Sequence, residues 1–375
     1  MIFKLYNNLC SIFIREGETM SFLYCNPIVF VINDEYEILV LTKELGIIYL
    51  EVNGNNYYED NVGVLSSQKN YAKIRVPQNV LNEAKKYDVI YRKTLKRKAY
   101  FPKMGNVIKE SFNFKPMIKE NNINIYHIAD VHYRFNIAKK TASYFGDELD
   151  LLIVNGDIGE VETLQNYYDV IKFVSDISKG FVPVVFSRGN HDTRGELAEK
   201  FADFFPANNK KTYYSFDLGC LGGVVLDCGE DKLDNHEEYG GVNIFERFRI
   251  DETLFLKELP KKNTLSFAVS HICPSQTTQC KEDIFNIEKD TYMTWNKELD
   301  RLGIKFMICA HIHKAYILQP HSKESTIDHN YPVIVGSACY EHDIVGTAIS
   351  IIDNKLVVRF TDSNRNIKEE NIIEL

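Results

Sequence analysis

The chain has 375 residues, of which 45% are hydrophobic and 26% charged, a composition typical of a globular protein. Its formal net charge of −8 argues against sequence-independent binding to nucleic acid, which needs many Lys and Arg contacts to phosphate. A length of 375 residues exceeds what one small core supports, so we expect two domains or one large α/β domain with an addition.

The N-terminal third of the chain is a series of short strand-like runs. The dipeptide Asn53-Gly54 follows one of them and suits a hairpin turn that needs positive φ at both central positions. Strands at this spacing predict a small β-sandwich over residues 1–118, with its first 20 residues unassigned and a polar linker at 118–124. The runs expected to be strands are 27–32, 37–42, 46–52 and 71–76.

The first 20 residues contain one short apolar segment followed by charges, and we do not expect a signal peptide there. Met20 offers an alternative start. No run approaches the ~20 apolar residues that cross a bilayer, so we expect a cytoplasmic protein without a membrane partner. The basic stretch Tyr91–Lys103 is interpreted as a solvated strand face or edge.

The eight cysteines form no C-x-x-C pair, which gives no sign of a zinc knuckle. Several lie in apolar runs, and buried, reduced thiols are the best interpretation. They are Cys10, Cys25, Cys220, Cys228, Cys273, Cys280, Cys309 and Cys339.

Apolar strands alternate with helical patterns from residue 123 to 375, and this alternation predicts an α/β layered domain. Residues 163–178 have apolar side chains at the spacing of one helical face. Residues 290–303 repeat this pattern, with Asp290 as a possible cap and Gly303 as the end. The expected strands are 123–129, 150–155, 182–187, 222–227, 265–270 and 304–310.

Five of these strands end in carboxylate, imidazole or amide side chains. The carboxyl ends of strands in an α/β sheet form the crevice where ligands bind, so we expect these side chains to converge. Imidazole mixed with carboxylate favours Zn, Mn or Fe over Ca or Mg. The side chains are Asp130, His132, Asp157, Asn190, His191, Asp192, His271, His311 and His313.

The order of these motifs, D-x-H, G-D, G-N-H-D, H and H-x-H, resembles that of the calcineurin-like metallophosphoesterases from residue 125 onward. The resemblance implies a four-layer αββα sandwich in which two stacked sheets are flanked by helices. The β-rich segment before it looks like the fibronectin-type (Ig-like) domain that precedes the catalytic domain in purple acid phosphatases and their bacterial relatives.

The resemblance also implies two metal sites that share Asp157. One site would be formed by Asp130, His132, Asp157 and His313, and the other by Asp157, Asn190, His271 and His311. The metals would be Mn, Zn or Fe. His191 would face the substrate as the proton donor to the leaving group.

Two positions depart from the family pattern. Ala310 stands where the family has glycine, which is tolerable if φ is negative there. Glu160 stands where purple acid phosphatases place a tyrosine ligand to iron(III), which puts a ferric-tyrosinate centre in doubt.

Three further residues near the G-N-H-D motif have expected roles. Asp192 is a candidate to orient His191, and Arg194 is a candidate phosphate contact because its guanidinium matches phosphate oxygens. Arg188 is a weaker candidate for the same contact, with a surface position as the alternative for both arginines. The acidic loop around His236 follows a strand of the same domain and could overhang the site.

These observations predict an enzyme that hydrolyses phosphate esters by a metal-bound hydroxide at a dinuclear centre. A phosphomonoesterase acting on a phosphorylated small molecule or phosphoprotein is the favoured interpretation, and a phosphodiesterase acting on nucleotide or other diesters is the alternative. A non-catalytic binding scaffold on the same fold is a third possibility, against which all seven ligand positions and His191 are filled. The sequence leaves the oligomeric state open.

Overall fold

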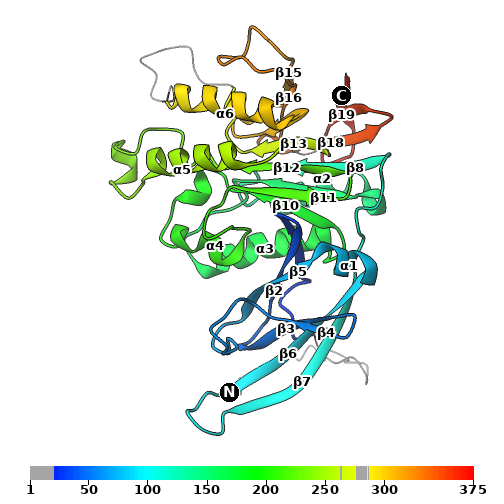
Figure 1. The fold of residues 1–375 in the computed structure, drawn as a ribbon, viewed down its shortest axis with the longest axis vertical. Coiled ribbons are helices and arrows are strands. Elements are labelled where there is room, and N and C mark those ends of the chain that lie inside the picture. Colours follow the sequence, from blue (N-terminus) through cyan, green and yellow to red (C-terminus); the bar gives the residue numbers. More distant parts are fainter. Residues whose placement is uncertain (1–20, 262–263, 276–284, 286) are drawn as a thin grey trace, which may run out of the picture.

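A computed structural model describes residues 21–261, 264–275, 285 and 287–375. Three sheets organise these residues, and helices cover the outer faces of the two larger ones (Figure 1). Cys10, Cys280 and Met20, named in the sequence analysis, lie outside the described residues.

The largest sheet has ten strands and combines the middle of the chain with both of its ends. Its parallel centre, β8-β9-β10, has β1, β2 and β5 on one side and β18, β19 and β20 on the other, while β17 pairs with β18. The bounds are β1 Ile28–Ile32, β2 Glu35–Leu41, β5 Tyr71–Pro77, β8 Ile123–Ile128, β9 Leu151–Asn155, β10 Pro183–Ser187, β17 Ala338–Cys339, β18 Ile344–Ile352, β19 Lys355–Thr361 and β20 Ile367–Glu374.

The second sheet has six strands in the order β11-β12-β13-β14-β16-β15, and β12, β13, β14 and β16 are parallel. Their bounds are β11 Tyr214–Leu218, β12 Leu221–Leu226, β13 Leu265–Ser270, β14 Phe306–Cys309, β15 Tyr316–Leu318 and β16 Val333–Val335. The third sheet has the order β4-β3-β6-β7, with bounds β3 Gly46–Val52, β4 Asn55–Tyr57, β6 Lys86–Lys96 and β7 Lys103–Asn113.

Three apolar clusters define four layers. One cluster lies between the two larger sheets, where Ile153 and Val185 share a core with Phe267. A second lies between the large sheet and the helices on its outer face, and a third between the six-stranded sheet and its own helices. The expected αββα sandwich is therefore confirmed. The helices are α1 Gln78–Ala84, α2 Phe135–Ala142, α3 Leu164–Ser178, α4 Phe201–Phe204, α5 Phe245–Glu258 and α6 Lys289–Leu302.

Local sequence signals explain the boundaries of the two expected helices. Thr163 caps α3 by accepting a hydrogen bond from the backbone N–H of Asn166, whose side chain returns the contact in a capping box. Gly303 ends α6 in the left-handed conformation, as expected. Asp290 does not cap α6, because the helix begins at Lys289 and places Asp290 in its first turn.

The fibronectin-type sandwich expected at the N-terminus is not confirmed. β1 pairs in parallel with β10, with Val29 opposite Pro183, so the N-terminal segment extends the large sheet instead of forming its own pair of sheets. β2 and β5 continue this extension, and the four-stranded sheet packs against the same core. The boundary between 1–118 and 123–375 stays a prediction, and the two segments share one sheet.

Several smaller expectations agree with the structure. Asn53 and Gly54 both have positive φ, 49° and 76°, in the tight turn between β3 and β4. Six described cysteines are free, and Cys228, Cys273 and Cys309 are buried. No described helix is both long enough and apolar enough to span a membrane.

We predict that residues 119–375 do not fold without the N-terminal strands. All five side chains of β1 are 0% exposed, and burial of each contributes about 1.5–3 kcal/mol. Their loss, about 10 kcal/mol, is comparable with the entire free energy of unfolding of a typical protein. Circular dichroism and size-exclusion chromatography of this fragment beside the full chain test the prediction, and a monomer with cooperative unfolding would contradict it.

Candidate metal centre

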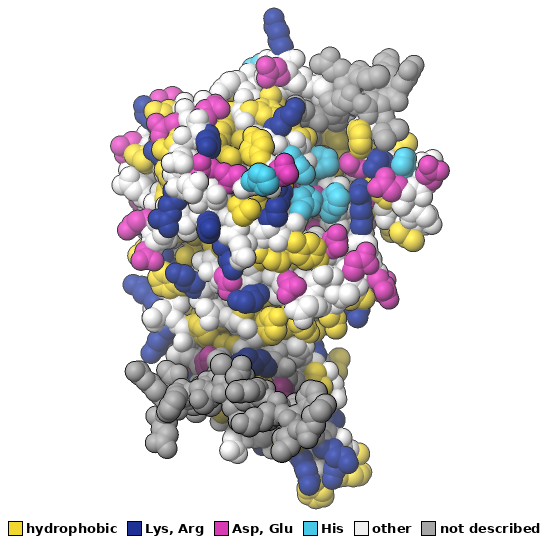
Figure 2. Space-filling model, turned by 180° about the vertical axis from the view of Figure 1, so that it is seen from behind, with side chains coloured by type: hydrophobic (Ala, Val, Ile, Leu, Met, Phe, Trp, Pro, Cys, Tyr) yellow, Lys and Arg dark blue, Asp and Glu magenta, His cyan; other side chains and the backbone are white. Residues whose placement is uncertain are grey.

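The polar residues that follow five strands meet at one place between the two larger sheets. Parallel strands bring their carboxyl ends to one edge, and both larger sheets present that edge to the same site. In Figure 2, histidine side chains gather in one patch on the face of the molecule. β8 leads to Asp130 and His132, β9 to Asp157, β10 to Asn190 and His191, β13 to His271, and β14 to His311 and His313.

Most of the expected ligands have a left-handed backbone, which costs free energy for residues other than glycine. Such strain persists where the surrounding structure enforces it, and it is concentrated at functional sites. The φ angles are 51° for Asp130, 43° for His132, 54° for Asp157, 74° for His311 and 53° for His313.

Two glycines allow the loops after β9 and β10 to touch. A Cβ atom on Gly156 would lie 2.4 Å from the backbone nitrogen of Gly189. A Cβ atom on Gly189 would lie 2.1 Å from Oδ1 of Asp157. The absence of side chains at both positions therefore makes room for the Asp157 carboxylate.

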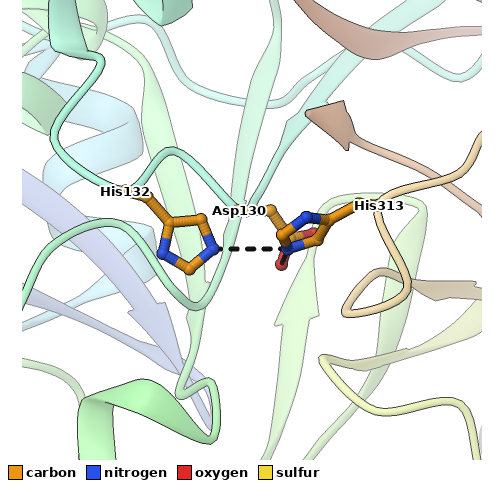
Figure 3. A group of neighbouring side chains, drawn as sticks. All are labelled: Asp130, His132 and His313. Carbon is orange, nitrogen blue, oxygen red and sulfur yellow. Dashed lines mark hydrogen bonds and ion pairs between the residues drawn. The ribbon is translucent and has the colours of Figure 1, made fainter. Parts of the chain in front are cut away.

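The first group of candidate ligands consists of Asp130, His132 and His313, whose ligand atoms lie within 4.8 Å of one another (Figure 3). The Nε2 atoms of His132 and His313 are 3.3 Å apart, and Nε2 of His313 lies 3.4 Å from Oδ1 of Asp130. The other oxygen of Asp130 accepts a hydrogen bond from the backbone N–H of His311. This contact fixes the carboxylate and leaves Oδ1 directed at the imidazoles.

The second group consists of Asp157, His271 and His311, again within 4.8 Å of one another. Nε2 of His271 lies 3.3 Å from Oδ2 of Asp157, and Oδ1 of Asn190 lies 3.1 Å from Nδ1 of His311. Asp157 also lies within 4.8 Å of His132, which links the two groups. The structure thus brings together all seven expected ligands as two adjoining groups, and their roles as ligands stay predictions.

Two buried polar atoms without a hydrogen bond indicate that these residues suit metal ions. Oδ1 of Asp130 and Nε2 of His271 are buried and have no hydrogen bond within the described part of the chain. Buried polar atoms without partners are costly, and a cation between them would satisfy both. Carboxylate oxygen and imidazole nitrogen are suitable donors for Zn, Mn or Fe.

The electrostatics of the site also favour a cation. Burial lowers the pKa of His271, but the charges of Asp157 and Asp130 outweigh this effect and raise it to about 10. Burial and the positive charge of His271 lower the pKa of His311 to about 4. The buried carboxylates therefore hold a proton on one imidazole, in the place where a metal ion would supply positive charge.

Two residues that the sequence analysis did not assign to the site orient His271. Nδ1 of His271 donates a hydrogen bond of 2.6 Å to the backbone oxygen of Asn155, which directs Nε2 toward the carboxylates. The Asn155 side chain is held by the Ser270 carbonyl and by His127. His127 is buried in the core. Asn155, a polar residue that ends an apolar strand, was the available sequence signal for this support of His271.

Asp192 connects the loop after β9, which carries Asp157, with the loop after β10, which carries Asn190. Its Oδ2 accepts hydrogen bonds from the backbone N–H groups of Gly189, at 2.8 Å, and Asp157, at 3.1 Å. Burial and the nearby charge of Asp157 raise the pKa of Asp192 to about 7. These contacts give Asp192 a loop-shaping role, and the orientation of His191 by Asp192 stays a prediction.

His191 lies at the exposed rim of the site. Its backbone N–H donates to Oδ1 of Asp157 at 2.9 Å, and its ring centroid lies 5.2 Å from that of His132. A ring nitrogen of His191 lies within 4.8 Å of the ligand atoms of His132 and Asp157. The side chain therefore reaches the site from the solvent side, where substrate would enter.

The two arginines near the motif are occupied by carboxylates. Arg194 binds the buried Glu230 through Nε and Nη2, both at 2.7 Å, so the phosphate contact expected of it stays a prediction with a competing partner. Arg188 pairs with Asp227 at 2.8 Å and is largely buried, which corrects its interpretation as a surface residue. Both partners belong to the segment after β12.

The acidic loop after β12 reaches the site, as the sequence analysis proposed. Oδ2 of Asp231 lies 3.9 Å from Nε2 of His311, a contact that the sequence analysis missed. His236 accepts a hydrogen bond from the backbone of Glu238 in the same loop. His329, in a polar loop where the sequence favours a solvated histidine, is instead buried, and it contacts Ser325 and the Tyr331 carbonyl.

The structure describes the surroundings of both residues that depart from the family pattern, Ala310 and Glu160. Ala310 is buried, and it is absent from the described residues with positive φ, so its methyl group is tolerated as expected. The backbone oxygen of Glu160 lies 3.5 Å from the hydroxyl of Tyr133.

Comparisons with known proteins agree with this geometry. The family profile of the calcineurin-like phosphoesterases matches residues 123–315. The fold is similar to that of the purple acid phosphatase PPD1 from yellow lupin seeds, with a TM-score of 0.62 and 12% identity over 94% of this chain and 74% of that one. It is also similar to PhoD, with a TM-score of 0.54 and 10% identity over 95% and 90% of the two chains. A search of curated protein sequences gave no match.

The chain belongs to the calcineurin-like phosphoesterase family. It is accordingly a metallophosphoesterase, a hydrolase of phosphoric ester bonds, and its family implies a dinuclear metal centre.

We predict that metal binding releases protons and strengthens as pH rises. His271 must be neutral to bind a metal, yet its pKa of about 10 keeps it protonated at pH 7 in the metal-free site. For the same reason, protonated His271 stabilises the metal-free protein fully below pH 6.5, and this contribution is lost as pH rises through about 10.

Calorimetric titration of Zn²⁺ or Mn²⁺ in two buffers of different ionisation enthalpy measures the released protons. The variant His321→Asn, which removes an exposed imidazole paired with Asp328, is a matched control and should release the same number. An observed enthalpy that does not depend on the buffer would contradict the prediction.

Proposed function

We propose that the protein is a phosphomonoesterase with a dinuclear metal centre held by Asp130, His132, Asp157, Asn190, His271, His311 and His313. The observation that carries this proposal is the pair of adjoining ligand groups, in which buried Asp130 and His271 each direct an atom without a hydrogen bond into the site. When bound, two metal ions supply activation of a water nucleophile and charge neutralisation of the phosphoryl oxygens.

In this proposal the protein positions the ligands before substrate arrives. Asp157 stands between the two groups, and its carboxylate is fixed by the backbone N–H of His191. Asp192 fixes the loops that carry Asp157 and Asn190. Asn190 adds an oxygen donor without adding negative charge, which suits a site for an anionic substrate.

His191 acts as the general acid. Its exposed ring can reach the leaving-group oxygen of a phosphate ester, while its backbone N–H remains tied to Asp157. A protonated imidazole can donate its proton to the leaving-group oxygen as the ester bond breaks. Asp231, beside His311, contributes negative charge at the same opening and disfavours substrates with additional anionic groups close to the phosphate.

The proposed substrate is a phosphate monoester on a small molecule or a protein. The similarity of fold to a purple acid phosphatase supports a monoester, and Glu160, in place of the tyrosine ligand, favours a pair of Zn, Mn or Fe(II) ions over a ferric-tyrosinate centre.

Replacing His191 by Ala should lower kcat for an aryl phosphate by about 10²- to 10⁴-fold, because the leaving group loses its proton donor. Metal content, measured by elemental analysis, should remain at two ions per chain for a site that keeps its seven ligands. Replacing Asp157 by Asn should lower both metal content and activity, because this carboxylate joins the two groups.

The variant His321→Asn is the control and should leave kcat and metal content unchanged, since the ring of His321 forms an exposed ion pair with Asp328. Full activity of Asp157→Asn, or of chelator-treated protein, would refute the proposed function. Two ions per chain without hydrolysis of any phosphate ester would support the binding scaffold instead.

We expect aryl phosphate to be hydrolysed at least tenfold faster than bis-aryl phosphate at equal concentration. A monoester has one organic group, and the rim around His191 must accommodate only that leaving group. The release of aryl alcohol from both substrates measures this preference. Faster cleavage of the diester would identify the enzyme as a phosphodiesterase.

A further inference from the structure

The hairpin formed by β6 and β7 projects beyond the sheet that supports it. The two strands pair from Lys86 opposite Asn113 to Lys96 opposite Lys103, whereas β3 pairs with β6 only as far as Lys93. Among the described residues, no third strand therefore lies beside the end of the hairpin, and Figure 1 places its turn at the lower extremity of the molecule.

This hairpin end is strongly basic. The segment Tyr91–Lys103 contains six Lys or Arg residues and no acidic residue, in a chain whose net charge is −8. Lys93 pairs with Glu44, but within the described residues Lys96, Arg97 and Lys98 have no acidic partner. In Figure 2, Lys, Arg and apolar side chains gather at the same lower end.

Large apolar side chains occupy the turn itself. Phe101 is 90% exposed, Tyr100 is 81% exposed and Leu95 is 60% exposed. Phe101 also has a φ of 52°, a left-handed conformation that is strained for a bulky side chain. Within the folded chain this strain is not offset by packing, because the ring is almost entirely in solvent.

Protection of a sheet edge explains only part of this pattern. β7 is an edge strand, as the sequence analysis expected for the basic stretch, and lysines on such an edge prevent pairing with other chains. Two exposed aromatic rings at the turn do not protect the edge, because they add apolar surface that promotes association with other molecules.

We propose that the hairpin end, residues 95–103, is a docking surface for an anionic lipid bilayer. Tyr and Phe rings insert favourably at the depth of lipid headgroups, and Lys and Arg around them are attracted to the negative surface. A projecting turn can reach that depth while the acidic body stays in water. Attachment to a bilayer surface departs from the expectation, drawn from the lack of a long apolar run, that the protein has no membrane partner. It does not depend on the chemistry of the metal centre.

A single-stranded nucleic acid fits this surface less well. Such a strand binds along a groove in which successive bases stack on separated aromatic side chains. Here Tyr100 and Phe101 are adjacent in one projecting turn, and the remainder of the chain is acidic and repels a long polyanion.

Sedimentation of the full chain with vesicles tests the proposal. The protein should bind vesicles of phosphatidylcholine with 30% phosphatidylglycerol in 100 mM salt, and should not bind pure phosphatidylcholine. Each basic residue near such a surface strengthens binding about fivefold, so K96Q/R97Q/K98Q should weaken it about a hundredfold. Y100S/F101S should weaken it at least tenfold, because the apolar contribution is lost.

The matched control K257Q/K289Q/K297Q removes the same charge from exposed positions on or beside α5 and α6 and should bind as the unmodified protein does. All variants should retain hydrolysis of a soluble aryl phosphate, which separates this test from that of the proposed function. In Phe101→Trp, the new indole should show a blue-shifted emission with anionic vesicles, against the constant background of the buried Trp295.

Three results would overturn the proposal: no binding to anionic vesicles, equal loss of binding in the control variant, or binding that Y100S/F101S leaves unchanged. Tighter binding of a 20-nucleotide oligonucleotide than of anionic vesicles, lost in K96Q/R97Q/K98Q, would also overturn it and assign the surface to nucleic acid.

Discussion

The structure depends on the burial of two carboxylates, Asp130 and Asp157, at the meeting point of two sheets. Burying negative charge is costly unless opposite charge or hydrogen bonds compensate for it. Backbone N–H groups of His311 and His191 supply one hydrogen bond to each carboxylate, and His271 supplies a positive charge. Since one oxygen of Asp130 receives no hydrogen bond within the described residues, the compensation is incomplete without a cation, and this favours metal binding by the folded chain.

That affinity relies on structure far from the carboxylates. The strained backbone of five expected ligands is held because each follows directly on a buried strand end, and rigid sheets on both sides leave the loops little freedom. Asn155 and His127 extend the same support behind His271, so the imidazole presents one defined nitrogen to the site. The geometry of the candidate ligands therefore depends on the packing of the core behind them.

The sequence predicted which residues meet at the candidate site because their signal is local. An apolar run followed at once by Asp, Asn or His marks a strand end, and parallel pairing then brings such ends together. The left-handed backbone of Asp130 and His132 is not part of this local signal, and only the structure shows it. The pairing of Arg194 with Glu230 has no such signal, because the two residues meet only through the path of the loop after β12. The same holds for the contacts that Asp192 makes.

The sequence predicted the N-terminal strands but not the sheet to which they belong. Short strands with turns between them are compatible with a separate sandwich or with the edge of a larger sheet, and only long-range pairing distinguishes the two. The continuous apolar run of β1, with every side chain buried, was the available signal, since a strand covered on both faces lacks polar alternation.

The parallel pairing of β1 with β10 also sets an order of events during synthesis. Val29 lies opposite Pro183, so the first strand leaves the ribosome 154 residues before its partner. At ordinary rates of translation this gap lasts roughly 10–30 s. For that time the sequence IVFVI has one edge without its native neighbour, and the large sheet closes only after its parallel centre exists. The order of translation thus leaves the apolar strand β1, the earliest of the described strands, without its parallel partner until residues 183–187 have been made.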